Sequence, residues 1–194
     1  TEARLLLAGA YMKRSQYGEA EKELHEALRL DPKYMPAEVM LTQLKVEAGK
    51  DKEASVLAQG LQKKYPKSAA GFELQGDVYV QEKKYSEAIK QYAEGFQAAR
   101  TPSLALKLSG LYRVTKQDSK AAGPLVDYLK LQPGDYTLRR DLASLYQTLG
   151  DNDKAIRQYE KLLTVQPKDP MVLNNLAWLY EAKGDPRSVE FAQK

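Results

Sequence analysis

Apolar residues recur along the chain at the spacing of α-helical faces, and short polar turns interrupt them at regular intervals. Leu7, Ala8 and Tyr11 share one face of a first predicted helix. The apolar face of a second helix carries Ala20, Leu24, Ala27 and Leu28. This helix ends at Asp31 and Pro32, because the residue before a proline is pushed out of the helical region. No run alternates between apolar and polar residues as a strand would. The pattern predicts an all-α fold of antiparallel helix pairs.

The same pattern returns about every 34 residues. Tyrosines at one phase are separated by 68, 33, 34 and 34 residues, and they are Tyr11, Tyr79, Tyr112, Tyr146 and Tyr180. Lys45 stands at the position that the first interval skips. Alanines keep the same period at Ala20, Ala54, Ala88, Ala121 and Ala155, and closing prolines follow it at Pro32, Pro66, Pro133 and Pro167. The period divides the chain into units 1–34, 35–68, 69–101, 102–135, 136–169 and a truncated unit 170–194. Because the last unit stops inside a predicted helix, we expect a single array cut from a longer one.

Three positions decide where individual helices should begin. Asp51 follows a glycine turn and is the expected N-cap of the helix behind it. Asp185 and Pro186 are expected as N-cap and first helical residue of the last helix. Pro124 falls several residues into a predicted helix, where proline costs about 3 kcal/mol. We therefore expect a late start or a kink at Pro124.

Composition narrows the class of protein and the chemistry. The hydrophobic content of 43% and charged content of 29% are typical of a folded chain, and the net charge is only +4. Since no basic run is long enough for a nucleic-acid-binding arm, we do not expect a nucleic-acid partner. Cysteine is absent, which excludes disulfides and thiolate ligands within these residues. The apolar runs are too short to span a bilayer, and we expect no metal site beside the single histidine, His25.

The tyrosine, alanine and proline positions given above resemble the tetratricopeptide repeat family over essentially the whole chain. The resemblance implies a right-handed superhelical solenoid of helix pairs. It also implies that the first helix of each pair lines a concave groove, which usually holds an extended peptide or a helix of a partner. We therefore expect a non-catalytic scaffold that binds a protein or peptide ligand and needs no cofactor.

The residues that line such a groove follow from the phase of the repeat. They are Leu5, Met12, Val39, Gln43, Val46, Asp77, Val80, Leu106, Arg113, Arg140, Ser144, Gln147, Asn174 and Trp178. The first half of this set is largely aliphatic and the second half is polar. We expect the groove to take an apolar segment at one end and to fix a polar or acidic group at the other, near Arg140 and Asn174.

The aromatic residues allow more than one interpretation. The thirteen tyrosines could form a stacking platform for a carbohydrate or a base, but their common phase indicates that most of them belong to the repeat core. The phase places Tyr146 in that core. Trp178 is either an aromatic anchor for a ligand or a residue that packs against a following unit. The sequence does not decide between these two roles.

A narrower resemblance covers residues 173–192, LNNLAWLYEAKGDPRSVEFA. This string is similar to repeats of the large tetratricopeptide lipoproteins of bacterial exopolysaccharide and PEP-CTERM protein-sorting systems, known as PrsT. The resemblance implies a location in the bacterial cell envelope, either periplasmic or as an outer-membrane lipoprotein whose acylated cysteine this segment lacks. A cytoplasmic location is the alternative.

Two functions other than an interaction scaffold are also compatible with the sequence. Repeat units that stack within one chain can also stack between chains, so the ends of the array could mediate self-association. The segment could also recruit partners for an enzyme whose catalytic domain lies elsewhere.

Overall fold

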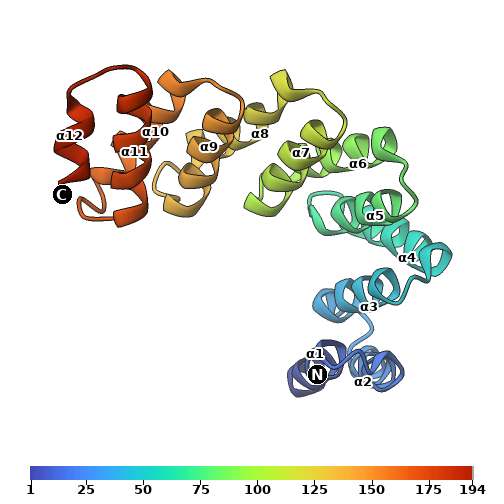
Figure 1. Ribbon diagram of the computed structural model, residues 1–194. Coiled ribbons are helices and arrows are strands. Elements are labelled where there is room, and N and C mark those ends of the chain that lie inside the picture. Colours follow the sequence, from blue (N-terminus) through green and yellow to red (C-terminus); the bar gives the residue numbers. More distant parts are fainter. Residues whose placement is uncertain (194) are drawn as a thin grey trace. The chain divides into compact units, whose positions relative to one another are not determined.

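The structure is a computed structural model that describes residues 1–193, and these residues form twelve α-helices joined by short turns (Figure 1). The chain divides into two compact units, unit 1 up to Leu108 and unit 2 from Ser109 onward. The helices of unit 1 are α1 Glu2–Lys13, α2 Tyr17–Leu30, α3 Met35–Glu47, α4 Asp51–Lys64, α5 Ala70–Gln81 and α6 Tyr85–Ala98. Helix α7, Pro102–Val114, crosses the border between the units. The helices of unit 2 are α8 Asp118–Leu131, α9 Tyr136–Thr148, α10 Asn152–Leu163, α11 Pro170–Ala182 and α12 Arg187–Ala192. The predicted all-α fold of helix pairs is confirmed; the end of the last helix at Lys194 lies outside the described residues.

In the turn that joins the two helices of each pair, one residue has a left-handed backbone conformation. The φ angles of these residues lie between 57° and 76°, and the residues are Ser15, Gly49, Lys83, Lys116, Gly150 and Gly184. The next amide in each turn donates to the carbonyl five residues earlier, which belongs to Tyr11, Lys45, Tyr79, Tyr112, Tyr146 or Tyr180. This bond closes the last turn of the first helix and satisfies a carbonyl that the helix would otherwise leave free. The period of the tyrosines therefore marks where each first helix ends.

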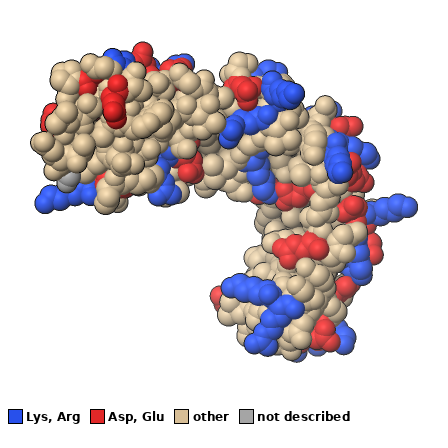
Figure 2. Space-filling view, viewed as in Figure 1, with Lys and Arg blue, Asp and Glu red and all other residues tan. Residues whose placement is uncertain are grey.

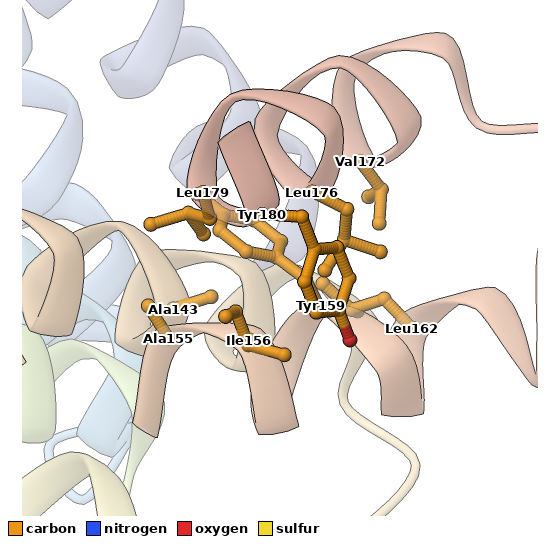
Figure 3. Packing of buried hydrophobic residues seen from close by; sticks show 9 residues of the cluster. All are labelled: Ala143, Ala155, Ile156, Tyr159, Leu162, Val172, Leu176, Leu179 and Tyr180. Atoms are coloured by element: carbon orange, nitrogen blue, oxygen red, sulfur yellow. The ribbon is translucent and has the colours of Figure 1, made fainter. Parts of the chain in front are cut away.

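Small residues allow the two helices of a pair to approach closely. The in-phase alanines Ala20, Ala54, Ala88, Ala121 and Ala155 are all fully buried. In unit 2, the aromatic and aliphatic side chains of α10 and α11 pack above Ala143 and Ala155 (Figure 3). Tyr159, Leu162, Leu176 and Tyr180 are almost fully buried in this cluster. These contacts between neighbouring pairs remove the apolar faces from water and thereby stabilise the stack.

The burial of the tyrosines differs in part from the expectation. Tyr146, which we expected in the core, is only half-buried and packs against the edge of the cluster. One face of its ring meets the ammonium of Lys154, 5.4 Å from the ring centroid. Part of the Tyr146 side chain therefore remains accessible to water. The buried tyrosines of unit 2 include Tyr159 on a second helix and, among the in-phase ones, Tyr180.

Two expectations about helix starts, those at Asp51 and at Asp185 and Pro186, are wrong. Helix α4 is capped at Lys50, and Asp51 is its first residue. Helix α12 begins at Arg187 after Pro186, while Asp185 accepts a hydrogen bond from the Arg187 amide. At Pro124 the late start does not occur, because helix α8 begins at Asp118 and contains the proline; the kink stays a prediction. Lys120, four residues before the proline, is exposed, so water can replace the amide donor that Pro124 lacks.

Lys45, the exception to the tyrosine phase, lies in a buried ion network of unit 1. Its side chain is 6% exposed, and its ammonium lies 2.6 Å from a carboxylate oxygen of Glu21 on α2 and 2.7 Å from one of Glu53 on α4. Burial alone would lower the pKa of Lys45, but the hydrogen bonds to both carboxylates outweigh it and raise the pKa. The hydrogen bond from Lys45 is also the largest cause that lowers the pKa of Glu21 and of Glu53. The network thus links α2 and α4 through α3.

Replacing Lys45 by methionine should lower the free energy of unfolding by about 1–2 kcal/mol at pH 7, because Glu21 would lose its main partner while keeping some contact with water. The depressed pKa values of the two glutamates stabilise the wild type above about pH 5, and this contribution disappears as the pH falls through their folded pKa values. The raised pKa of Lys45 stabilises the fold below about pH 10. Urea unfolding of both chains at pH 7 and pH 3 tests this: the difference between them should shrink at pH 3. An equal difference at both pH values would contradict the ion network.

Candidate functional site

A cavity of about 480 Å³ opens between α3 and α5 in unit 1, and we call it the unit 1 cavity. Its aliphatic walls are Val39, Val46, Leu74 and Val80, with Ala70 at one side. Its polar lining is formed by Gln43, Glu47, Glu73, Asp77, Gln81 and Lys107. Five of the residues assigned to the groove from the repeat phase meet here: Val39, Gln43, Val46, Asp77 and Val80. The first helices of two successive pairs therefore build one hollow with an apolar wall and a polar edge.

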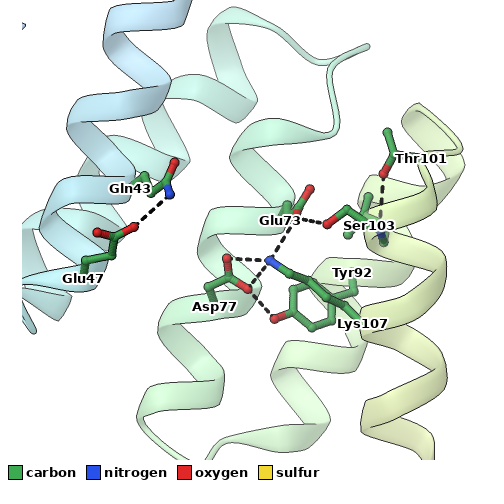
Figure 4. A network of polar contacts seen from close by, with 9 residues as sticks. Gln43, Glu47, Glu73, Asp77, Tyr92, Thr101, Ser103 and Lys107 are labelled. Carbon is green, nitrogen blue, oxygen red and sulfur yellow. Dashed lines mark hydrogen bonds and ion pairs between the residues drawn. The ribbon is translucent and has the colours of Figure 1, made fainter. Parts of the chain in front are cut away.

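A network of charged residues holds one edge of the cavity in place (Figure 4). The ammonium of Lys107, on α7, lies 2.7 Å from both carboxylate oxygens of Asp77 and 2.9 Å from a carboxylate oxygen of Glu73. The Tyr92 hydroxyl donates to Asp77 at 2.6 Å, and the Ser103 hydroxyl donates to Glu73 at 2.6 Å. These bonds join α5, α6 and the start of α7. The carboxylates are therefore fixed before any ligand arrives.

The protonation states in this network follow from its geometry. Burial opposes the charge of Lys107, but the contacts with Asp77 and Glu73 outweigh burial and raise its pKa. Burial, followed by the hydrogen bond to Asp77, raises the pKa of the Tyr92 phenol far above its ordinary range. At neutral pH, Lys107 is therefore charged and Tyr92 is a neutral donor.

The opposite edge of the cavity carries a simpler pair. The amide of Gln43 donates to a carboxylate oxygen of Glu47 at 2.8 Å, one helical turn further along α3. This hydrogen bond is exposed to solvent. The Gln81 amide donates to the Val46 carbonyl at 3.0 Å and so links α5 to α3 at the end of the cavity. A ligand can reach the carboxylate of Glu47 without breaking an ion pair that the structure records.

The other groove residues assigned in unit 1 lie outside this cavity. Leu5 and Met12 pack against the buried cluster around Ala8 and Leu24. Leu106, on α7, is exposed. The repeat phase assigned Leu5 and Met12 to the groove face. In the structure, both side chains are partly buried against this cluster.

The groove residues assigned in unit 2 lie along the first helices α9 and α11, except Arg113, which is exposed at the end of α7. Trp178 is 54% exposed, and Asn174, one turn before it, is exposed as well. Ser144 is exposed, whereas Gln147 accepts a hydrogen bond from the buried Tyr159 hydroxyl at 3.2 Å.

Arg140 is half-buried, and its charge acts on the cap residue of α11. The cap is Asp169, whose carboxylate accepts amide hydrogen bonds from Met171 and Val172 and a hydrogen bond from the Tyr136 hydroxyl at 2.6 Å. The Tyr136 bond is the largest cause that lowers the pKa of Asp169, and the charge of Arg140 adds to it. The positive charge of Arg140 thus acts on Asp169, and a role of Arg140 in binding an acidic group stays a prediction.

The repeat phase did not predict Glu47, Glu73 and Lys107 as cavity residues. The repeat phase gives no signal for the pair of Glu73 and Lys107, because the unit 69–101 has 33 residues, so that Leu106 is the phase partner of Glu73 and Lys107 falls one position later. Glu73 and Asp77 are one helical turn apart, so one lysine can reach both. The periodicity of apolar residues does not reveal such a pair, since ion pairing between units depends on the facing side chains.

Charge is distributed differently over the two units on the face seen in Figure 2. Blue and red side chains alternate over much of unit 1, whereas the surface around α10–α12 is mostly uncharged in this view.

Among the residues described, no helix is long and apolar enough to cross a membrane.

Two family models, both described as tetratricopeptide repeat, match residues 11–78 and 137–179. No curated protein sequence matches the chain. Among solved structures, PilF of Pseudomonas aeruginosa is similar with a TM-score of 0.66 at 18% identity, over 99% of this chain and 88% of that one. A thermophilic tetratricopeptide protein of Thermus thermophilus has a TM-score of 0.61 at 22% identity, over 92% of this chain and 97% of that one.

YrrB, described as a tetratricopeptide protein with an unusual peptide-binding site, is similar with a TM-score of 0.61 at 17% identity. The match covers 88% of this chain and 89% of YrrB. At these identities the structural likenesses concern the fold alone.

Proposed function

Because the chain belongs to the tetratricopeptide repeat family, whose members typically act as non-catalytic interaction scaffolds, we propose that it binds an extended segment of a partner protein in the unit 1 cavity. The observation that carries this proposal is the combination of an aliphatic wall with fixed polar groups at its edge. Val39, Val46 and Val80 offer apolar surface, and Gln43 and Asp77 offer directional polar contacts. Binding sites commonly combine these two features.

The rigidity of the cavity supports the same function. Lys107, Tyr92 and Ser103 hold the carboxylates of α5, and the Gln81 bond fixes α5 against α3. A ligand that binds a preformed surface does not have to order these side chains, which lowers the entropic cost of association. YrrB, with a similar fold, is described as having a peptide-binding site, and this agrees with the proposal without locating a site here.

The proposal can be tested by selecting peptides from a random displayed library on the intact chain and comparing two tryptophan variants. Val39→Trp should fill the cavity from its wall, and we expect the affinity of a selected peptide to fall at least about tenfold, equal to about 1.4 kcal/mol. Circular dichroism should show unchanged helicity.

The matched control is Val56→Trp on α4, where the valine is 71% exposed and does not line the unit 1 cavity. It should change the affinity less than about twofold, which is under about 0.5 kcal/mol. Selected peptides that bind wild type and Val39→Trp equally would contradict the proposed site.

In unit 2, we propose Ser144, Asn174 and Trp178 as further partner contacts, with Trp178 as an aromatic anchor. Its exposed indole is the main support, since tryptophan is favoured at binding hot spots. Self-association through exposed apolar residues such as Leu6 of α1 remains the second candidate, and sedimentation at several concentrations separates it from a monomeric scaffold.

We further propose a bacterial envelope assembly as the setting of this scaffold, such as an exopolysaccharide or protein-sorting system. The resemblance of residues 173–192 to PrsT-type repeats supports it. The fold is also similar to that of PilW, described as a type IV pilus biogenesis factor, with a TM-score of 0.65 at 18% identity, over 99% of this chain and 90% of PilW. Cell fractionation of the source organism tests the setting, and recovery of the protein from the cytoplasm alone would contradict it.

A further inference from the structure

Building on the function proposed above, we infer that the unit 1 cavity selects a partner segment that carries a lysine or arginine beside an aliphatic residue. The aliphatic residue would lie against Val39, Val46 and Val80. The cationic group would lie at the carboxylate of Glu47.

The charge of the cavity lining favours a cation. Three carboxylates line it, from Glu47, Glu73 and Asp77, against one ammonium, from Lys107. The lining therefore carries two negative charges in excess at neutral pH. An acidic peptide would be repelled by this excess, while a basic one would reduce it.

The single cation of the cavity lining is not free to bind an anionic ligand. Lys107 contacts both oxygens of Asp77 and one oxygen of Glu73 at 2.7–2.9 Å. An acidic group could bind Lys107 only by displacing these carboxylates. The network of Lys107, Asp77 and Glu73 therefore offers no free positive charge to a ligand, and its net charge is negative.

Glu47 is the carboxylate that a ligand reaches most easily. The contact that the structure records for its side chain is with the neutral amide of Gln43 at 2.8 Å. Glu47 is exposed and follows Val46 of the aliphatic wall directly in α3, one helical turn after Gln43. A cationic side chain could accordingly pair with Glu47 while an amide or carbonyl of the same segment meets Gln43.

The apolar wall fits the stem of such a side chain. Lysine and arginine bury their methylene chains along apolar surface while keeping the charged head near water or a counter-ion. Val39 and Val80 are half-exposed and Val46 is buried, so they form a wall that remains accessible beside the carboxylates. An aliphatic neighbour in the ligand would cover the rest of this wall.

The test uses the peptides selected from the random library. Those whose binding is lost in Val39→Trp should be enriched in lysine or arginine next to leucine, isoleucine or valine. For the strongest of them, Glu47→Gln should weaken binding about three- to fivefold, as expected for one partly solvated ion pair. Glu47→Lys should weaken it about tenfold or more, and raising the salt concentration should reduce the effect of both.

The matched control is Glu87→Gln on α6, an exposed glutamate outside the cavity lining. It should leave affinity within about twofold of wild type. Both Glu47 variants should keep the wild-type helicity, because Glu47 lies outside the Lys107 network.

The possible outcomes separate this inference from the proposed function. Basic peptides that depend on Val39 and Glu47 support both. Peptides that depend on Val39 but lack basic residues, or bind equally to Glu47→Lys, overturn the inference and leave the proposed function standing. Selected peptides that are indifferent to Val39→Trp overturn both.

Discussion

Replacing Tyr159 by alanine should lower the free energy of unfolding by about 3–5 kcal/mol, because the ring lies at the centre of the buried cluster of unit 2. Tyr159 is 1% exposed and packs among residues of α10 and α11 (Figure 3). The substitution leaves a cavity among these residues and removes the hydrogen bond from the hydroxyl to Gln147. Urea unfolding followed by circular dichroism measures the loss.

The control for this change is Tyr146→Ala in the same unit. Tyr146 is half-buried, and water already reaches part of its ring, so we expect a loss of about 1–2 kcal/mol. The contrast between the two tyrosines matters more than either value. Equal losses, or a larger loss for Tyr146, would contradict the assignment of the core.

The second large effect should come from Gly71→Ala, at the contact between α4 and α5. A Cβ atom at Gly71 would lie 2.7 Å from the backbone nitrogen of Gln62 and 2.9 Å from the backbone oxygen of Ala58. Backbone atoms cannot rotate away as a flexible side chain can, so α5 must shift from α4. We expect a loss of about 1–3 kcal/mol in the free energy of unfolding, which urea denaturation measures.

Gly60→Ala is the matched control, since Gly60 also lies inside a helix of unit 1 but has nothing within 4 Å of its Cβ position. Alanine is the better helix former, and the substitution should stabilise the chain by about 0.5–1 kcal/mol. Helix propensity alone predicts the same sign at both positions. If Gly71→Ala also stabilises the chain, the close approach of α4 and α5 is wrong.

The sequence predicted the helix pairs because the requirements of the fold repeat in every unit. The alanines at the close contacts and the residues that close each first helix recur at the same phase, and a period is visible without a structure. The burial of Tyr146 could not be read in this way. The repeat phase places Tyr146 at the end of its helix. The exposure of its ring depends instead on the side chains that neighbouring elements place around it.

The candidate site was predicted in part. Val39, Gln43, Val46 and Asp77 meet in one cavity, as the phase of the first helices indicates, whereas Met12 lies outside this cavity and is partly buried against the cluster around Ala8. Lys107 and Lys45 were missed because their roles depend on carboxylates supplied by other helices. Pairing of this kind is a property of facing surfaces, and the sequence of one helix does not contain it.

The most direct test of the account is a methyl NMR titration of the intact chain with a peptide selected from the library. We expect the signals of Val39, Val46 and Val80 to shift as peptide is added, because these side chains form the wall of the unit 1 cavity. The signal of Val56 on α4, outside this cavity, should stay unchanged. Shifts confined to Val56 or to unit 2, with the three cavity valines unaffected, would contradict the central claim that this cavity binds the partner.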